Sequence, residues 1–191
     1  MLIWMLALCS QGCSYKGSAD YQNEFLYNSG FLRIPEYEVQ KFSSEVFDIS
    51  QELGISPSWL MVVFTEYSEG FRLPLLMDID QDYLISNHGI THENLKELSY
   101  LQQLKYVYAY FDLVIIETSP FVSVSDLLIS SINPEFRGQE FDFVINYKPS
   151  WEFETFQYWD TDRDGFLTPQ DIENYIYFQY RSVYTEPIPK P

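Results

Sequence analysis

Aspartates occupy every second position from Asp160 to Asp164, and Gly165 follows them directly. This alternation turns the three carboxylates toward the same side of the chain. Negative charges that face one another over so short a segment repel strongly unless a cation lies between them. The glycine permits the sharp backbone turn that a chain wrapped around a cation needs. The segment therefore predicts a tight loop built around an ion, with regular elements entering and leaving it.

The spacing continues through Asp171 and matches the calcium loop of EF-hand proteins. Calcium is a hard ion that takes about six to eight oxygen ligands, and this pattern supplies oxygens at loop positions 1, 3, 5, 7, 9 and 12. The expected ligands in chain order are Asp160, Asp162, Asp164, the backbone carbonyl of Phe166, Thr168 directly or through a water molecule, and Asp171.

The twelfth position departs from the usual pattern, because Asp171 stands where a bidentate glutamate is common. Aspartate is one methylene shorter, so it should ligate less fully or draw the loop inward. Dockerin-type calcium loops also end in aspartate, which keeps calcium binding open. The alternative is an acidic turn that holds no ion. A lone loop of this kind is more typical of a structural clip than of a sensor, and millimolar calcium would fill it.

Helix signals flank the loop on both sides. Thr168 and Pro169 are typical of an N-cap and a first helical position. We therefore expect residues 150–181 to form a helix–loop–helix. Its apolar positions are Trp151, Phe153, Phe156 and Trp159 before the loop and Ile172, Tyr175, Ile176 and Tyr180 after it.

Upstream of the loop, apolar residues recur at spacings of three and four, which indicates amphipathic helices. Few segments alternate with a period of two, apart from an ambiguous stretch at 141–144. We expect a mainly α protein with a helical domain over residues 36–145. The predicted helices are Glu36–Leu53, a buried one that starts at Pro57, Leu101–Val114, and Val124–Ile132 with Ser123 or Ser125 as its cap.

The run Leu53-Gly-Ile-Ser-Pro-Ser-Trp-Leu-Met-Val-Val-Phe64, followed by Glu66-Tyr-Ser68, resembles the entry helix of lysozyme-like lytic transglycosylases. The resemblance extends over roughly residues 40–135. It implies a lysozyme-like domain whose partner is the glycan of peptidoglycan. In that family a glutamate at the end of the buried helix protonates the scissile oxygen, and burial raises its pKa for this role.

Glu66 is the best candidate for that acid, Glu69 is the second, and Ser68 could orient either. Aligned without a gap, however, the family's glutamate falls on Tyr67. One residue on a helix is about 100° of rotation, which would point the Glu66 carboxylate away from the cleft. Two hypotheses follow. The chain is either a non-catalytic relative that binds glycan or joins an envelope assembly, or an active transglycosylase with Glu66 as general acid. The alternative for both glutamates is an ordinary solvated helix end.

Charge narrows the class of partner. The chain carries 28 acidic against 11 basic residues, a net charge of −17, so its surface repels nucleic-acid phosphates. His88 and His92 lie four apart, as two metal ligands on a helix would. The turn signal at Asn87 to Gly89 favours a surface loop there instead.

The first thirteen residues are apolar and then small and polar, which resembles a bacterial lipoprotein signal. Cleavage after Gly12 would leave Cys13 first in the mature chain to carry lipid, although Cys9 is a second candidate. We then expect a tether at 14–35, an extended tail at 182–191, and a periplasmic or outer-membrane-anchored protein that meets the membrane only through its lipid. The alternative is a buried N-terminal strand or helix with two incidental cysteines.

Overall fold

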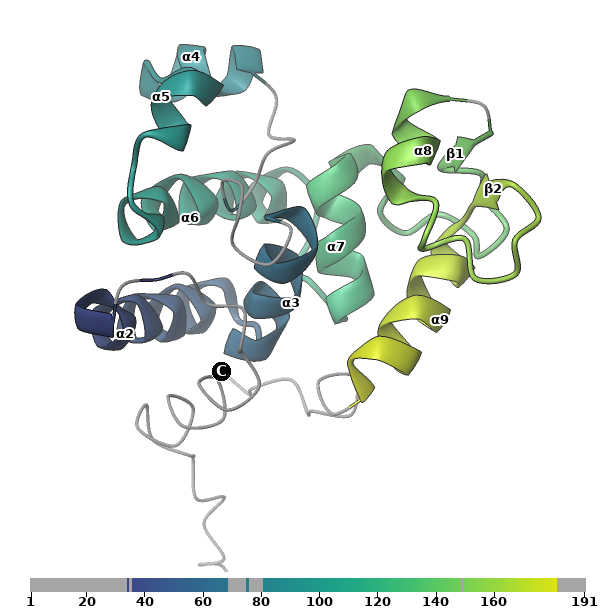
Figure 1. The fold of residues 1–191 in the computed structure, drawn as a ribbon, viewed down its shortest axis with the longest axis horizontal. Coiled ribbons are helices and arrows are strands. Elements are labelled where there is room, and N and C mark those ends of the chain that lie inside the picture. The colour runs from purple at the N-terminus through teal and green to yellow at the C-terminus, as the bar shows by residue number, and fades with distance from the viewer. Residues whose placement is uncertain (1–33, 35, 69–74, 76–80, 149, 182–191) are drawn as a thin grey trace, which may run out of the picture.

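The computed structural model describes residues 34, 36–68, 75, 81–148 and 150–181 (Figure 1). Predictions for Cys9, Cys13, Glu69 and the tail therefore lie outside the described residues. Within them the protein is mainly α, as predicted. The elements are α2 (Glu36–Leu53), α3 (Pro57–Tyr67), α4 (Gln81–His88), α5 (His92–Lys96), α6 (Tyr100–Glu117), α7 (Val124–Ile132), the 3₁₀ helix η1 (Pro134–Phe136), β1 (Asn146–Tyr147), α8 (Trp151–Phe156), β2 (Phe166–Leu167) and α9 (Pro169–Gln179).

Local signals account for where the long helices begin and end. Gly54 has φ +69°, a left-handed conformation that ends α2. Ser56 then accepts a hydrogen bond from the Ser58 backbone N–H at 3.3 Å, and Pro57 begins α3. Ser99 caps α6 through a capping box with Gln102. The predicted bounds of α2 and α7 are confirmed, whereas α6 extends beyond Leu101–Val114 at both ends.

The core lies where α2, α3, α6 and α7 meet. α2 packs along α6, and α3 packs against α7. Phe42 of α2 and Phe64 of α3 are both buried, and their ring centroids lie 6.3 Å apart. Phe111 of α6 meets Phe121 edge to face at 5.5 Å. These aromatic rings fill the space between helices, because protein interiors pack to near-crystalline density.

One sequence-based expectation needs correction, and one ambiguous stretch is resolved. His88 and His92 do not lie in a loop: His88 is the last residue of α4 and His92 the first of α5, with Gly89 at φ +61° between the helices. The turn signal was real, but it covers only the junction. The ambiguous stretch at 141–144 is not a strand, and the strand begins at Asn146.

Among the described helices, none is both long and apolar enough to cross a bilayer.

The C-terminal helix–loop–helix consists of α8, the 160–171 loop and α9. In Figure 1, α9 (yellow) lies beside α7, and the two elements are in contact. The short strands β1 and β2 pair antiparallel, with Asn146 opposite Leu167 and Tyr147 opposite Phe166. This pairing fastens the segment before α8 to the middle of the loop.

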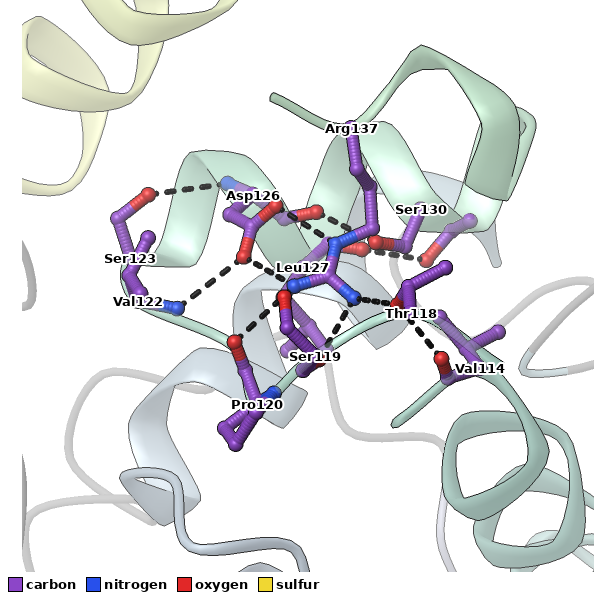
Figure 2. Close-up of polar contacts among 11 residues, drawn as sticks. Val114, Thr118, Ser119, Pro120, Val122, Ser123, Asp126, Leu127, Ser130 and Arg137 are labelled. Atoms are coloured by element: carbon purple, nitrogen blue, oxygen red, sulfur yellow. Dashed lines mark hydrogen bonds and ion pairs between the residues drawn. The ribbon is translucent and has the colours of Figure 1, made fainter. Parts of the chain in front are cut away.

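A buried arginine holds the connection between α6 and α7 (Figure 2). Arg137 donates from Nη1 to the Thr118 hydroxyl and to the Ser119 carbonyl at 2.9 Å, and from Nη2 to the Pro120 carbonyl at 3.1 Å. Its Cζ lies 4.5 Å from the centroid of the Phe121 ring. The guanidinium thereby orders residues 118–121, because it donates hydrogen bonds to backbone carbonyls in a segment that belongs to no helix or strand.

Candidate metal centre

The predicted loop brings three carboxylates together. One oxygen each from Asp160, Asp162 and Asp164 lies within 4.8 Å of the others. Asp160 is buried, with 9% of its surface exposed, whereas the other two face solvent. Oxygens gathered from one short loop in this way could hold a metal ion.

Backbone N–H groups of the same loop fix these carboxylates. Asp160 accepts from the N–H of Arg163 at 2.8 Å and from the N–H of Gly165 at 3.0 Å. Asp162 accepts from the N–H of Asp164 at 3.1 Å, and Asp164 in turn accepts from that of Phe166 at 2.8 Å. The loop can turn this tightly because Arg163 and Gly165 both have positive φ, at +62° and +89°. Each carboxylate is therefore held in place by one or two donors from the backbone around it.

The strand pairing orients the predicted backbone ligand. The carbonyls of Gly165 and Leu167 accept from the N–H groups of Lys148 and Ile145 at 2.9 and 2.8 Å. Successive carbonyls of an extended chain point to opposite sides, so the carbonyl of Phe166 faces away from β1. An orientation away from β1 is compatible with the predicted role of this carbonyl as the ligand at loop position 7.

Asp171 has a different set of partners from the other aspartates. It is buried, and its Oδ1 accepts from the backbone N–H and the hydroxyl of Thr161 at 3.1 and 3.0 Å. Its Oδ2 accepts from the backbone N–H and the hydroxyl of Thr168 at 3.1 and 2.6 Å. Thr168 and Asp171 also form the capping box that begins α9. Asp171 therefore joins the two ends of the loop, and among the described residues it lies outside the group of three converging carboxylates.

An open pocket of about 470 Å³ lies over the loop and is lined by Asp162, Asp164 and Asp171. Asp142 and Asn174 also line it, and the sequence analysis did not single out either residue. Asp142 comes from the segment just before β1, far from the loop in sequence. The β1–β2 pairing and a hydrogen bond from the Gln170 N–H to the Phe141 carbonyl at 3.3 Å bring it near. Two-residue strands leave almost no signal in a sequence.

The candidate general acid, Glu66, lies on α3 where it contacts the C-terminal helix–loop–helix. Its side chain is half-buried, and Oε2 accepts from the indole Nε1–H of Trp159 at 3.1 Å. Oε1 accepts from the hydroxyl of Tyr175 at 3.1 Å and from that of Tyr180. The neighbouring Ser68, predicted to orient Glu66, donates its hydroxyl to the Phe64 carbonyl of its own helix. The carboxylate is thus satisfied by donors from the C-terminal helix–loop–helix.

Glu66 in turn affects the two phenols. Burial first, and then the charge of Glu66 with its hydrogen bond, raises the pKa of Tyr175 and that of Tyr180 above the ordinary value. Both side chains therefore stay protonated at neutral pH and act as donors to the carboxylate.

Tyr67, the residue onto which the family's glutamate aligns, is buried. Its ring contacts Phe156 and Trp159 edge to face, with centroids 5.9 and 6.2 Å away. Its hydroxyl approaches the Leu128 carbonyl at 3.4 Å. Tyr67 is therefore part of the interface with the C-terminal helix–loop–helix.

Comparisons with family models, curated proteins and solved structures find no match to this chain. The resemblance of residues 40–135 to lysozyme-like lytic transglycosylases stays a prediction that rests on the residues themselves.

Proposed function

We propose that this protein binds calcium in the 160–171 loop and that the ion acts as a structural clip for the C-terminal helix–loop–helix. The observation that carries the proposal is the convergence of Asp160, Asp162 and Asp164 within 4.8 Å. Three carboxylates at this separation repel one another, and a divalent cation among them turns that repulsion into attraction.

The donor set favours calcium over other metals. Every donor that the loop offers is an oxygen, and neither of the two histidines of the chain lies in it. Zinc prefers nitrogen and sulfur ligands, and magnesium demands near-ideal octahedral geometry. Calcium tolerates irregular oxygen shells. The three aspartates and the Phe166 carbonyl would supply four ligands, Thr168 a fifth through water, and solvent the remainder, while Asp171 closes the loop behind them.

We also propose that the protein works in a bacterial envelope, where it engages peptidoglycan or a protein assembly in a binding role. The resemblance over residues 40–135 suggests the glycan. The engagement of Glu66 by Trp159, Tyr175 and Tyr180 supports binding over catalysis. A general acid must reach the scissile oxygen and be protonated, whereas this carboxylate accepts three hydrogen bonds from its own chain. The alternative, an active transglycosylase with Glu66 as acid, requires that these donors leave.

Thermal unfolding in calcium and in chelator tests the metal proposal. An ion bound only by the folded protein stabilises it by about 2.7 kcal/mol at a concentration 100 times its Kd. We expect the melting temperature to rise with millimolar calcium and Asp160→Ala to abolish the rise. Asp48→Ala removes the same charge from an exposed position on α2 and should leave the rise intact. Equal melting of the wild type in calcium and in chelator would refute calcium binding.

A further inference from the structure

Trp159 links the predicted calcium loop directly to α3. It is fully buried and immediately precedes Asp160, the first predicted ligand. Its indole N–H donates to Glu66, and its ring stacks on Phe156 of α8 with centroids 4.6 Å apart and an interplanar angle of 17°. A shift of the backbone at Asp160 must therefore move the indole, because the two residues are covalent neighbours and the ring has no free space around it.

The other end of the loop reaches the same carboxylate. Asp171 is the third helical residue of α9 and completes its capping box, and Tyr175 lies one helical turn later on the same helix face. Tyr175 and Tyr180 both donate their hydroxyls to Oε1 of Glu66. The helix that starts at the loop thus carries two donors to Glu66, and the residue before the loop carries the third.

From this arrangement we infer that Glu66 is a positioning residue for the calcium loop. The inference rests on the proposed calcium site. Glu66 fixes Trp159 on one side of the loop and α9 on the other, and so holds the two loop ends at the separation that the ion requires. Without the ion, repulsion among the aspartates spreads the loop and weakens the three hydrogen bonds on Glu66.

This coupling has to work in both directions. If bound calcium favours the docked arrangement of Trp159 and α9 by a certain factor, that docked arrangement must strengthen calcium binding by the same factor. Loss of the Glu66 carboxylate, which holds the arrangement, must therefore weaken calcium binding. Between coupled sites in proteins this factor is typically about 5 to 150. A hydrogen-bonded cluster with no link to the loop would instead stabilise the protein equally with and without calcium.

Calorimetric calcium titration of the full chain distinguishes the two cases. We expect Glu66→Ala to bind calcium at least ~5-fold more weakly than the wild type. Glu66→Gln keeps one acceptor oxygen and should fall between them. Glu45→Ala removes the same charge from an exposed position on α2 and should bind like the wild type. If Glu66→Ala does not fold, Tyr175→Phe combined with Tyr180→Phe removes only the two hydroxyls and should still weaken binding.

A second readout follows the contact itself. The indole N–H resonance of Trp159 in nitrogen-15 spectra should shift when calcium is withdrawn and when Glu66 is replaced by alanine. That of Trp59 is the internal control, because its indole N–H is buried and has no hydrogen-bond partner among the described residues. If Glu66→Ala and Glu45→Ala both bind calcium and do so with equal affinity, the coupling is overturned while the metal proposal stands. A wild type that binds no calcium would instead overturn the metal proposal on which it rests.

Discussion

Arg137 faces Asp126 through two parallel hydrogen bonds, from Nε to Oδ1 and from Nη2 to Oδ2, each 2.8 Å long (Figure 2). Both side chains are largely buried, at 7% and 12% exposure. Asp126 also accepts from the backbone N–H of Val122 at 3.1 Å. The pair therefore neutralises itself and ties the loop before α7 to the chain after it.

Arg137→Lys should destabilise the protein even though the charge is kept. An ammonium group cannot make two parallel bonds to a carboxylate, and it leaves carbonyls of the 118–121 segment without donors. We expect a loss of up to about 3 kcal/mol in the free energy of unfolding by urea, below the ~3–5 kcal/mol for removing one partner of a buried pair, because the charge is kept. Arg181→Lys, at an exposed position, should change it by less than ~0.5 kcal/mol. Similar losses in the two variants would contradict a structural role for the Arg137 network.

Gly165→Ala should lower both stability and calcium affinity. A Cβ at this position would meet only the Lys148 Cβ at 3.8 Å, so the cost arises from the backbone, which has φ +89°. For an L-residue this left-handed conformation costs roughly 1–2 kcal/mol. Gly138→Ala is the matched control, because Gly138 also has positive φ and a Cβ added there meets no atom of the described residues within 4 Å beyond its chain neighbours. Both variants should melt lower, but only Gly165→Ala should lose affinity in a calcium titration.

Tyr175 and Tyr180 should make the protein sensitive to alkali. Their pKa values are raised in the folded state, so the folded protein holds their protons more tightly than the unfolded chain, in which a tyrosine pKa is about 10. Their contribution to stability is complete below pH ~10 and is lost as the pH rises above that value. Urea midpoints from pH ~8 to ~11 should fall less steeply in the Tyr175→Phe, Tyr180→Phe double variant. The exposed Tyr37→Phe should follow the wild type, and parallel curves for all three proteins would contradict the assignment.

Isolated cell walls test the peptidoglycan proposal. The purified protein should sediment with them but release no anhydro-muropeptides, because its candidate acid is occupied by three donors of its own chain. Chromatography of the soluble fraction measures the release. Activity that persists in Glu45→Gln but disappears in Glu66→Gln would establish the catalytic alternative with Glu66 as acid.

Labelling with a fatty-acid probe in a bacterium tests the predicted anchor. The wild type should take up the label and Cys13→Ser should not, because a thioether needs the sulfur. Label that is lost only in Cys9→Ser would move the anchor to Cys9. Absence of label from the wild type would leave the first thirteen residues without a lipid role.

Periodicity was sufficient to predict the long helices, but not the short helices α4 and α5, nor which elements pack against one another. Glu36–Leu53 and Val124–Ile132 could be read from apolar spacing and from the capping residues beside them. The three converging aspartates were equally local, because their geometry depends on alternation within one short loop. Such features need no knowledge of the rest of the chain.

Long-range pairing was what the sequence could not reveal. Glu66 looked like a helix-end glutamate, and nothing near it signals that Trp159 and two tyrosines from the far end of the chain supply its donors. Asp171 completes the capping box with Thr168 and also accepts a hydrogen bond from the Thr161 N–H. The second of these contacts forms only when the loop is closed. Asp142 reaches the pocket through the two-residue strand pairing and the hydrogen bond of Gln170 to Phe141, neither of which has a sequence signal.

The three hydrogen bonds on Glu66 join residues 93, 109 and 114 positions apart. We expect contacts over such separations to form late in folding, because closing a large loop costs entropy before nearby contacts compensate it. Interactions made after the main barrier slow unfolding and hardly alter the folding rate. An ion bound at the 160–171 loop would therefore act chiefly on lifetime: the protein would open more slowly in calcium, while a chain refolding from urea would reach the native state at nearly the same rate with or without it.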